Sequence, residues 1–478
     1  MPMPMTIRPA CERLSSNILG LLRHHRSGLF MLAIAVGLVS GAGAVLFRLG
    51  IDAWTKTLTG AQDYTLSLGP GTGALSFLGR WFIVAAPVLS GLVIGPLMTW
   101  PGRAPTGHGV AGVLWSSRAS DGVMAPGPAA TTVVCAVLTI GGGGSVGPEG
   151  PIAELGASSA SLFGRRLGLP RQAVRLLAAA GTAAGIAAAF NAPLAGAFFA
   201  MEVVLVDFTV DAFTFVVLAC VSSTVLSHHL LGTSLSLSLP ALNLAGTAQL
   251  GWVAALGVLG GLTGAGFSRC RYLSADAVSA GADRLQLPLW ARPAVGGLLV
   301  GGLLLGIPSM YGESSAVLGR ALDGRYPALV LAGLVLAKIV ATSVTLAVGM
   351  PGGVFAPSLF IGGMLGACFG TFVAPDRPHA AAVFGVLGMG AVFSGAARAP
   401  ITGIVLIIEM TGEYNLLTPL MLAVVLATVT GRFLTCSTIY TEELRRRGMS
   451  IEDPQAPTSF GARVQRRWRA RRNSTGRP

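Results

Sequence analysis

The sequence Gly141-Gly142-Gly143-Gly144-Ser145-Val146-Gly147-Pro148-Glu149-Gly150-Pro151 interrupts an apolar run, 131–140, that suits a lipid bilayer. It holds six glycines, two prolines and one carboxylate. Glycine adopts backbone conformations closed to other residues, and proline lacks an N–H and fits only the first turn of a helix. We therefore expect a broken helix, with a new helix that begins near Pro148 and carries Glu149 at its N-terminus.

A break of this kind at membrane depth predicts an anion site. Freed backbone groups are tolerated in lipid only where they line a cavity or are buried in protein. A helix N-terminus offers unpaired N–H groups and roughly half a positive charge. Glu149 would then lie where an anion would lie, and a carboxylate near the membrane centre, which costs about 2.5–3.5 kcal/mol, is a functional hypothesis. The alternative is an ordinary acid near a helix N-terminus.

The composition indicates an integral membrane protein. Of the 478 residues, 52% are hydrophobic and 11% are charged, with a mean hydropathy of +0.69, whereas a typical soluble domain is about 25% charged. Several apolar runs are shorter than the roughly 20 residues of a perpendicular span. We therefore expect tilted or partial helices in a bundle, which small residues such as the 66 glycines allow to pack closely. The runs are 29–47, 81–98, 213–226, 252–267, 294–305, 328–348, 381–393, 401–410 and 416–430.

The formal net charge of +13 gathers at the two ends of the chain. By the positive-inside tendency, both ends are predicted to be cytoplasmic in a cell membrane, with an even number of crossings. Attraction of a disordered tail to anionic lipid explains the C-terminal arginines better than nucleic-acid binding does. The arginines are Arg8, Arg13, Arg23 and Arg26 before the first run, and Arg445, Arg446, Arg447, Arg463, Arg466, Arg467, Arg469, Arg471 and Arg472 after the last.

Other classes find little support. An intramembrane enzyme would need a nucleophile with a base or metal ligands at helical spacing, and no HExxH occurs. The match of 143–147 to GxSxG lacks the strand-to-helix turn that this motif requires. We therefore expect no enzyme, no metal site and no cofactor. No CxxC spacing occurs, and the cysteines are predicted to be buried free thiols: Cys11, Cys135, Cys220, Cys270, Cys368 and Cys436.

A repeat relates two parts of the chain. Gly181-Thr182-Ala183-Ala184-Gly185 leads to Asn191-Ala192-Pro193-Leu194-Ala195-Gly196 and Glu202, and Gly388-Met389-Gly390-Ala391-Val392 leads to Arg398-Ala399-Pro400-Ile401-Thr402-Gly403 and Glu409. The offset is 207 (388 − 181 and 400 − 193). At an offset of 206 (353 − 147), Gly147-Pro148-Glu149-Gly150-Pro151 falls on Gly353-Val354-Phe355-Ala356-Pro357. Corresponding broken helices in two halves predict a transport site at the repeat interface near the midplane.

Three motifs resemble the CLC family of chloride channels and chloride/proton exchangers, and the similarity covers about 29–446. They are Gly147-Pro148-Glu149-Gly150-Pro151, Gly353-Val354-Phe355-Ala356-Pro357 and Phe190-Asn191-Ala192-Pro193-Leu194-Ala195-Gly196. The resemblance implies an all-α polytopic membrane protein. It further implies a homodimer with one pore per subunit, two inverted halves (about 29–230 and 250–446) and helix N-termini aimed at chloride. A basic N-terminal segment (1–28) and a basic disordered tail (447–478) remain, and the tail is too short for the nucleotide-binding modules of many members.

The resemblance also implies residue roles. Glu149 is the gating glutamate, which competes with chloride and swings away when protonated. Gly147 and Gly150 flank it, and Phe355, with the backbone N–H groups of Val354 to Ala356, and the hydroxyl of Tyr440 lie at the central anion site. Such donors suit conduction because a fixed positive charge would hold chloride too long. Taken alone, Phe355 and Tyr440 would be interpreted as core residues.

One motif departs from the family pattern. Its usual sequence is Gly-Ser-Gly-Ile-Pro, whose serine binds chloride, and here it reads Gly107-His108-Gly109-Val110-Ala111. His108 would donate a ring N–H to the anion, or charge near neutral pH and bind it more tightly. The alternative is a histidine turned into an aqueous vestibule or bonded to backbone. Anion selectivity therefore stays open, with fluoride and nitrate as alternatives to chloride.

A second departure concerns protons. Exchangers of the family usually carry a glutamate immediately after the position of Glu202, and this chain has Val203 there. We therefore expect a voltage-gated chloride channel, with chloride/proton antiport as the alternative. Glu202 and Glu409 are expected to be structural, bonding backbone groups of a neighbouring broken helix.

Overall fold

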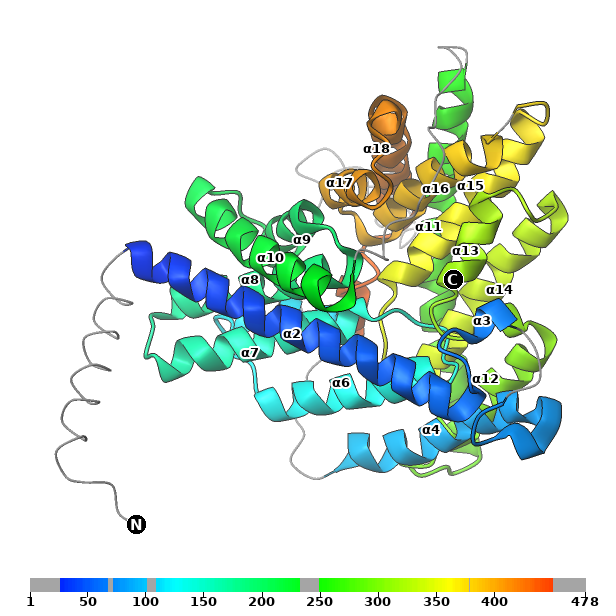
Figure 1. The fold of residues 1–478 in the computed structure, drawn as a ribbon, viewed down its shortest axis with the longest axis horizontal. Helices are drawn as coiled ribbons and strands as arrows, with labels where there is room; N and C mark the ends of the chain where they lie inside the picture. The colour runs from blue at the N-terminus through cyan, green and yellow to red at the C-terminus, as the bar shows by residue number, and fades with distance from the viewer. Residues whose placement is uncertain (1–25, 68–71, 101–108, 233–248, 378, 450–478) are drawn as a thin grey trace, which may run out of the picture.

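The computed structural model describes residues 26–67, 72–100, 109–232, 249–377 and 379–449, which form helices joined by loops (Figure 1). In these ranges the only β pairing is one isolated bridge. The helices of the first part of the chain are α2 (Arg26–Thr59), α3 (Tyr64–Ser67), η1 (Ser76–Trp81), α4 (Phe82–Thr99), α5 (Val110–Ala119), α6 (Pro126–Gly141), α7 (Glu149–Arg166), α8 (Arg171–Phe190), α9 (Pro193–Phe199), η2 (Ala200–Leu205) and α10 (Val210–Leu231). Those of the second part are α11 (Leu250–Arg284), α12 (Arg292–Gly306), η4 (Pro308–Met310), α13 (Ser315–Leu322), α14 (Ala328–Ala347), α15 (Phe355–Val373), α16 (Ala380–Ala397), α17 (Pro400–Thr411), η5 (Tyr414–Leu416), α18 (Leu417–Leu434) and α19 (Thr441–Arg446).

The glycine-rich stretch breaks the chain where the sequence predicts. Helix α6 ends at Gly141, and Gly143 takes a left-handed φ of +97°, which a residue with a side chain rarely adopts. Helix α7 then begins at Glu149 with Pro148 as its N-cap. The predicted break and restart are confirmed.

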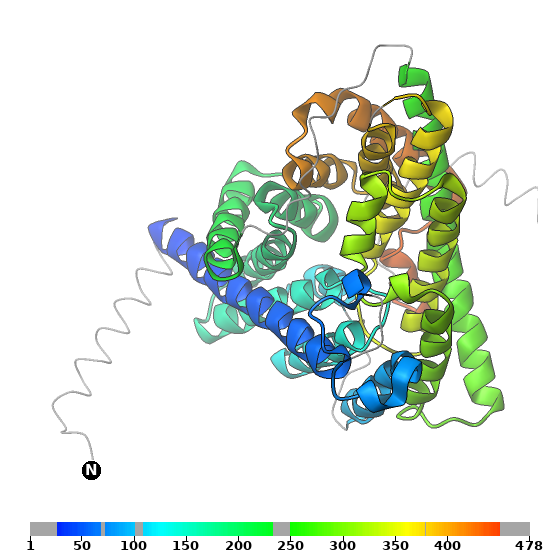
Figure 2. The same cartoon turned by 45° about the vertical axis from the view of Figure 1, so that its right-hand side comes forward.

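The chain consists of two inverted halves, as predicted. Helix α15 packs on α16 as α7 packs on α8. Helices α8 and α16 both end in a left-handed residue, Asn191 (φ +55°) and Arg398 (φ +56°), and a proline starts the next helix in both halves. In Figures 1 and 2 the helices α7 to α10, cyan to green, and α15 to α18, yellow to orange, form two groups that meet at α9 and α17.

Close crossings of glycines join the helices within each half. A side chain on Gly156 would collide with the carbonyl oxygen of Gly181, and one on Gly362 would collide with that of Gly388. Gly156 and Gly362 are equivalent under the repeat, and so are Gly181 and Gly388. Small residues at such crossings let the backbones of membrane helices approach closely.

Nine described helical segments are long and apolar enough to cross a membrane, and α12 and α17 are shorter, as expected for partial helices. Two of the nine, α8 and α15, are absent from the predicted apolar runs. Both lie largely inside the bundle, and α8 consists mostly of Ala and Gly, which allow close packing.

The cysteine prediction is partly wrong. The five cysteines within the described ranges form no disulfide, and Cys135 and Cys220 are buried. Cys270 and Cys368 are partly exposed and Cys436 is exposed, because they lie on outer faces of the bundle or in the loop after α18. Cys11 lies outside the described residues.

Candidate functional site

The two broken-helix motifs pair with each other directly. The N–H of Gly147 donates to the carbonyl oxygen of Gly353 over 3.0 Å, and the N–H of Gly353 donates to that of Gly147 over 2.7 Å. These residues are equivalent under the repeat (353 − 147 = 206). An antiparallel bridge between equivalent residues places the local twofold relation of the halves here, so the predicted repeat interface is confirmed.

Three helices begin at this point. A methyl group on Gly109, the N-cap of α5, would lie 3.3 Å from Cα of Gly150 in the first turn of α7. A methyl group on Gly150 would lie 3.5 Å from Cα of Gly353, just before α15. The N-termini of α5, α7 and α15 therefore converge, and their N–H groups and dipoles favour negative charge at one place.

Glu149 lies in this convergence and is 1% exposed. Its Oε1 accepts a hydrogen bond from the N–H of Phe355, and the carboxylate also interacts with the N–H of Ala356. Its Oε2 has no hydrogen-bond partner among the described residues. The carboxylate of one half thus occupies the N-terminus of α15 in the other half, as an anion would.

Aromatic rings enclose the same place. The ring of Phe355 lies 4.8 Å from that of Phe190 and 4.2 Å from that of Phe393, measured between centroids. Phe199 contacts both Phe355, at 6.0 Å, and Tyr440, at 6.3 Å. The structure therefore brings Phe355 and Tyr440 into one cluster around the convergence.

The remaining predicted anion ligands fall at or near this site. Val354 is the N-cap of α15 and is buried. Tyr440 is the N-cap of α19, and its buried hydroxyl has no described hydrogen-bond partner while interacting electrostatically with Glu149. His108 lies outside the described residues.

Two further glutamates link the halves reciprocally. Glu202 accepts hydrogen bonds from the N–H groups of Ile401 (3.1 Å) and Thr402 (2.9 Å) and from the hydroxyl of Thr402 (2.8 Å), at the start of α17. Glu409 accepts from the N–H groups of Leu194 (2.9 Å) and Ala195 (2.7 Å), at the start of α9. Their predicted structural role is confirmed.

Comparison with known proteins places the chain in a family. The family model described as "Voltage gated chloride channel" matches residues 87–432. The chain belongs to the CLC family. A ClcB-like chloride channel protein of Ralstonia nicotianae is 30% identical over 424 residues, covering 87% of this chain and 97% of the relative. The voltage-gated ClC-type chloride channel ClcB of Escherichia coli is 32% identical over 388 residues, covering 78% and 90%.

Solved structures show the same fold. A slow cyanobacterial Cl⁻/H⁺ antiporter aligns with a TM-score of 0.74 at 25% identity, covering 88% of this chain and 97% of that one. A CLC-type fluoride/proton antiporter aligns with a TM-score of 0.68 at 22% identity, covering 87% and 97%.

In this CLC chain, Val203 lies in the π-helical turn η2 and is buried. A guanidinium nitrogen of Arg118 donates to the carbonyl oxygen of Val203 over 3.2 Å, and one of Arg175 donates to that of Leu205 over 3.2 Å. The neighbourhood of Val203 therefore holds two cations.

Two buried charges near the site escaped the sequence analysis. Glu154, in α7, accepts the N–H of Gly109 over 2.7 Å at the start of α5. Lys338, in α14, is fully buried and donates to the carbonyl oxygens of Gly312 (3.2 Å) and Glu313 (3.1 Å) and to a serine hydroxyl. A signal existed for Lys338, because a single charge within the apolar run 328–348 marks a functional hypothesis.

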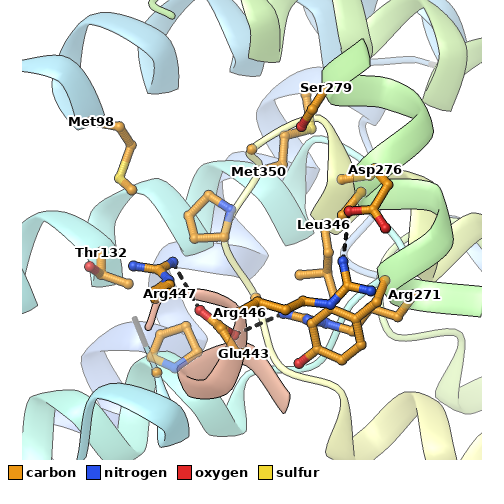
Figure 3. Close-up of a pocket in the computed structure, with 18 residues that line it drawn as sticks. Met98, Thr132, Arg271, Asp276, Ser279, Leu346, Met350, Glu443, Arg446 and Arg447 are labelled. Atoms are coloured by element: carbon orange, nitrogen blue, oxygen red, sulfur yellow. Dashed lines mark hydrogen bonds and ion pairs between the residues drawn. The ribbon is translucent and has the colours of Figure 1, made fainter. Parts of the chain in front are cut away.

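A cavity of about 400 Å³ leads to the convergence (Figure 3). Gly109, Pro151 and Gly352 line it on the side of the three N-termini. Figure 3 shows three arginines at this cavity, where the carboxylate of Glu443 pairs with Arg271 and Arg447, both at 3.0 Å. Arg446 pairs there with Asp276 at 2.6 Å. With three arginines and two carboxylates this mouth is basic by one net charge, and the cavity joins it to the candidate anion site.

Next to this cavity, Glu442 in α19 lies outside the membrane-spanning helices. Burial raises its pKa, but hydrogen bonds from Arg445, Ser437 and Arg446 outweigh burial and lower the pKa to about 2. The carboxylate of Glu442 is therefore ionised throughout the ordinary pH range.

Proposed function

We propose that this chain passes chloride across a cell membrane through a pore gated by Glu149, as a channel rather than a proton-coupled exchanger. The observation that carries the proposal is the position of the Glu149 carboxylate, which accepts N–H groups at the start of α15 while one of its oxygens has no described partner. A chloride ion has the same charge and takes the same donors. Carboxylate and chloride therefore exclude each other.

Protonation supplies the means of opening. A hydrogen bond to a charged acceptor is roughly twice as strong as one between neutral groups. The neutral acid loses this advantage and its attraction to the α15 dipole, while a chloride ion keeps both. Protonated Glu149 then leaves the N–H groups of Phe355 and Ala356 to the anion.

The central site offers donors without a full positive charge. The backbone N–H groups of Val354 to Ala356 and the hydroxyl of Tyr440 can hold chloride and still release it, which conduction requires. The buried Tyr440 hydroxyl has no described protein partner, so a transported anion would satisfy it.

The surroundings of Val203 support uncoupled conduction. No acid stands at this position, and the guanidinium groups of Arg118 and Arg175 nearby raise the energy of any excess proton. Chloride/proton antiport is the second candidate, because the similar cyanobacterial structure is that of a Cl⁻/H⁺ antiporter. Antiport would require a proton route that bypasses Val203.

Selectivity among anions rests on His108 as a proposal from the sequence. Replacing it by serine, the residue of the family motif, should shift the permeability order among chloride, fluoride and nitrate. An unchanged order in anion-exchange flux assays on His108→Ser would remove this residue from selectivity.

The deciding experiment uses purified protein in liposomes with a steep chloride gradient and a clamped voltage. Chloride efflux and external pH are recorded together. Chloride efflux without coupled proton movement supports the channel. Protons driven uphill in fixed ratio to chloride would make the protein an exchanger, and fluoride flux without chloride flux would change the substrate.

We also propose a homodimer with one pore per subunit and both termini in the cytoplasm. Support comes from membership of the family and from Leu194 and Ile401, whose side chains are exposed beside the reciprocal glutamate contacts. A second subunit would cover them. Cross-linking in mild detergent that yields monomers only would contradict the dimer. Members of this family are transporters, so we propose no enzymatic reaction.

A further inference from the structure

We infer that Glu154 is a second carboxylate that competes with the transported anion, at the N-terminus of α5. This inference rests on the proposed function, because it assumes that anions reach the convergence of α5, α7 and α15. It adds a second place of competition, on the side of the basic cavity.

The geometry of α7 pairs the two carboxylates. Glu149 and Glu154 are five residues apart on one helix, about 7.5 Å along its axis. Glu149 binds the start of α15, and Glu154 binds the N–H of Gly109 at the start of α5. Each carboxylate of α7 therefore occupies the N-terminus of a different helix at the same convergence.

The hydrogen-bond partner of Glu154 lies at the cavity. This partner, Gly109, and the neighbour of Glu154 along α7, Pro151, both line the cavity of about 400 Å³ that carries three arginines. An ion that leaves this basic mouth reaches the N-terminus of α5 on its way to Glu149. The Glu154 side chain is 4% exposed, so little water screens its charge there.

Independent observations indicate that a ligand belongs at this convergence. The Oε2 atom of Glu149 and the hydroxyl of Tyr440 are buried polar atoms without hydrogen-bond partners in the described ranges. Native proteins satisfy the large majority of such atoms. Glu149 and Tyr440 interact electrostatically. Helix α19, which starts just after Tyr440, packs on α5.

The contact of Glu154 differs from a rigid helix cap. Glu202 and Glu409 each accept consecutive N–H groups with both oxygens. In the described part of the chain, Glu154 accepts one N–H, that of Gly109. One hydrogen bond is more easily exchanged for an anion than a two-oxygen cap.

The charge of Glu154 should lower chloride affinity. Removal of one buried negative charge, about 7.5 Å along α7 from the place of Glu149, is expected to decrease the half-saturating chloride concentration about tenfold. Glu154→Gln makes this change while its amide oxygen still accepts the N–H of Gly109. A residue that only caps α5 would leave the glutamine variant close to wild type.

The test measures chloride efflux from liposomes as a function of chloride concentration, for the full-length wild type, Glu154→Gln and Glu154→Asp. The aspartate keeps the charge but is one methylene shorter, so it releases the Gly109 N–H. Competition predicts that half-saturating chloride decreases in the order wild type, aspartate, glutamine. If Glu154 only caps α5, chloride efflux should be impaired more in Glu154→Asp than in Glu154→Gln.

Asp121→Asn serves as the matched control, because it removes an exposed carboxylate beyond the other end of α5. It should change half-saturating chloride less than twofold. Calorimetric titration of each variant with chloride in detergent provides a readout independent of flux. Unchanged or weaker chloride binding in Glu154→Gln overturns the inference, whereas a wild type that passes no anion overturns the proposed function instead.

Discussion

One pair of glutamates, Glu202 and Glu409, and a third glutamate, Glu149, use the same interaction to different ends. Glu202 and Glu409 each grip a helix N-terminus of the opposite half with both carboxylate oxygens. Glu149 also binds the N-terminus of a helix in the other half, but one of its oxygens has no described partner. The pair closes its helix ends, and Glu149 covers a helix end that an anion can take.

The difference lies in what each helix end meets. Helices α9 and α17 pack against each other, so that the start of α9 meets Glu409 near the end of α17 and the start of α17 meets Glu202 just after α9. Helix α15 begins beside α5 and α7, next to the cavity with its three arginines. A carboxylate at a helix N-terminus is thus a structural link where both of its oxygens are hydrogen-bonded, and a competitor for an anion where one oxygen has no described partner beside a cavity.

The largest expected effect comes from breaking the structural pair. Glu202→Ala leaves the N–H groups of Ile401 and Thr402 without their acceptor, and each buried unsatisfied group costs about 1–3 kcal/mol. We expect the free energy of unfolding to fall by about 2–4 kcal/mol. Thermal unfolding of the detergent-solubilised protein measures this loss. Glu149→Ala is the comparison, and an equally large loss of unfolding free energy in that variant would remove the distinction between Glu202 and Glu149.

Next in size is the effect of Glu149→Gln on pH dependence. The amide has no proton to gain or lose and resembles the protonated gate. Flux should become independent of pH while anions still pass, so that the variant conducts about tenfold more than wild type at alkaline pH. Stopped-flow chloride efflux between pH 5 and pH 8 checks this. Strong pH dependence in the variant would count against Glu149 as the gate.

A smaller effect is expected from Lys338→Met. Its ammonium group is buried, donates to three uncharged oxygens of the described residues and interacts electrostatically with Glu149 and Glu313. Loss of this cation should raise half-saturating chloride about threefold, opposite in sign to Glu154→Gln. The concentration series for Glu154 measures both. A decrease in half-saturating chloride would exclude an attractive role for Lys338.

The smallest expected effect concerns Glu442. Its folded-state pKa of about 2 lies below the ordinary value of 4.5, so its contribution to stability is complete above about pH 4.5 and is lost as pH falls towards 2. Glu442→Gln should therefore leave the shape of the flux–pH curve between pH 5 and pH 8 unchanged. A shift of that curve would show that α19 takes part in gating.

The sequence predicted the parts of the site that rest on strong local signals. Glycine and proline breaks fix where α7 and α15 begin, and a carboxylate in an apolar setting stands out at Glu149, Glu202 and Glu409. The partner of Glu154 is not predictable in this way, because Gly109 is 45 residues away and only the packing of α5 on α7 brings them together. Helix α8 was missed because its many alanines and glycines serve packing rather than contact with lipid.

The reciprocal hydrogen bonds of Glu202 and Glu409 form at different times for the two halves during synthesis. When α17 emerges from the ribosome, Glu202 is already in the membrane and can receive it. Helix α9 has no such partner, because Glu409 follows Leu194 by 215 residues. At about 5–20 residues per second this delay is roughly 10–40 seconds. Through that interval the N–H groups of Leu194 and Ala195 lack this acceptor, and water, lipid headgroups or the insertion machinery would have to take its place.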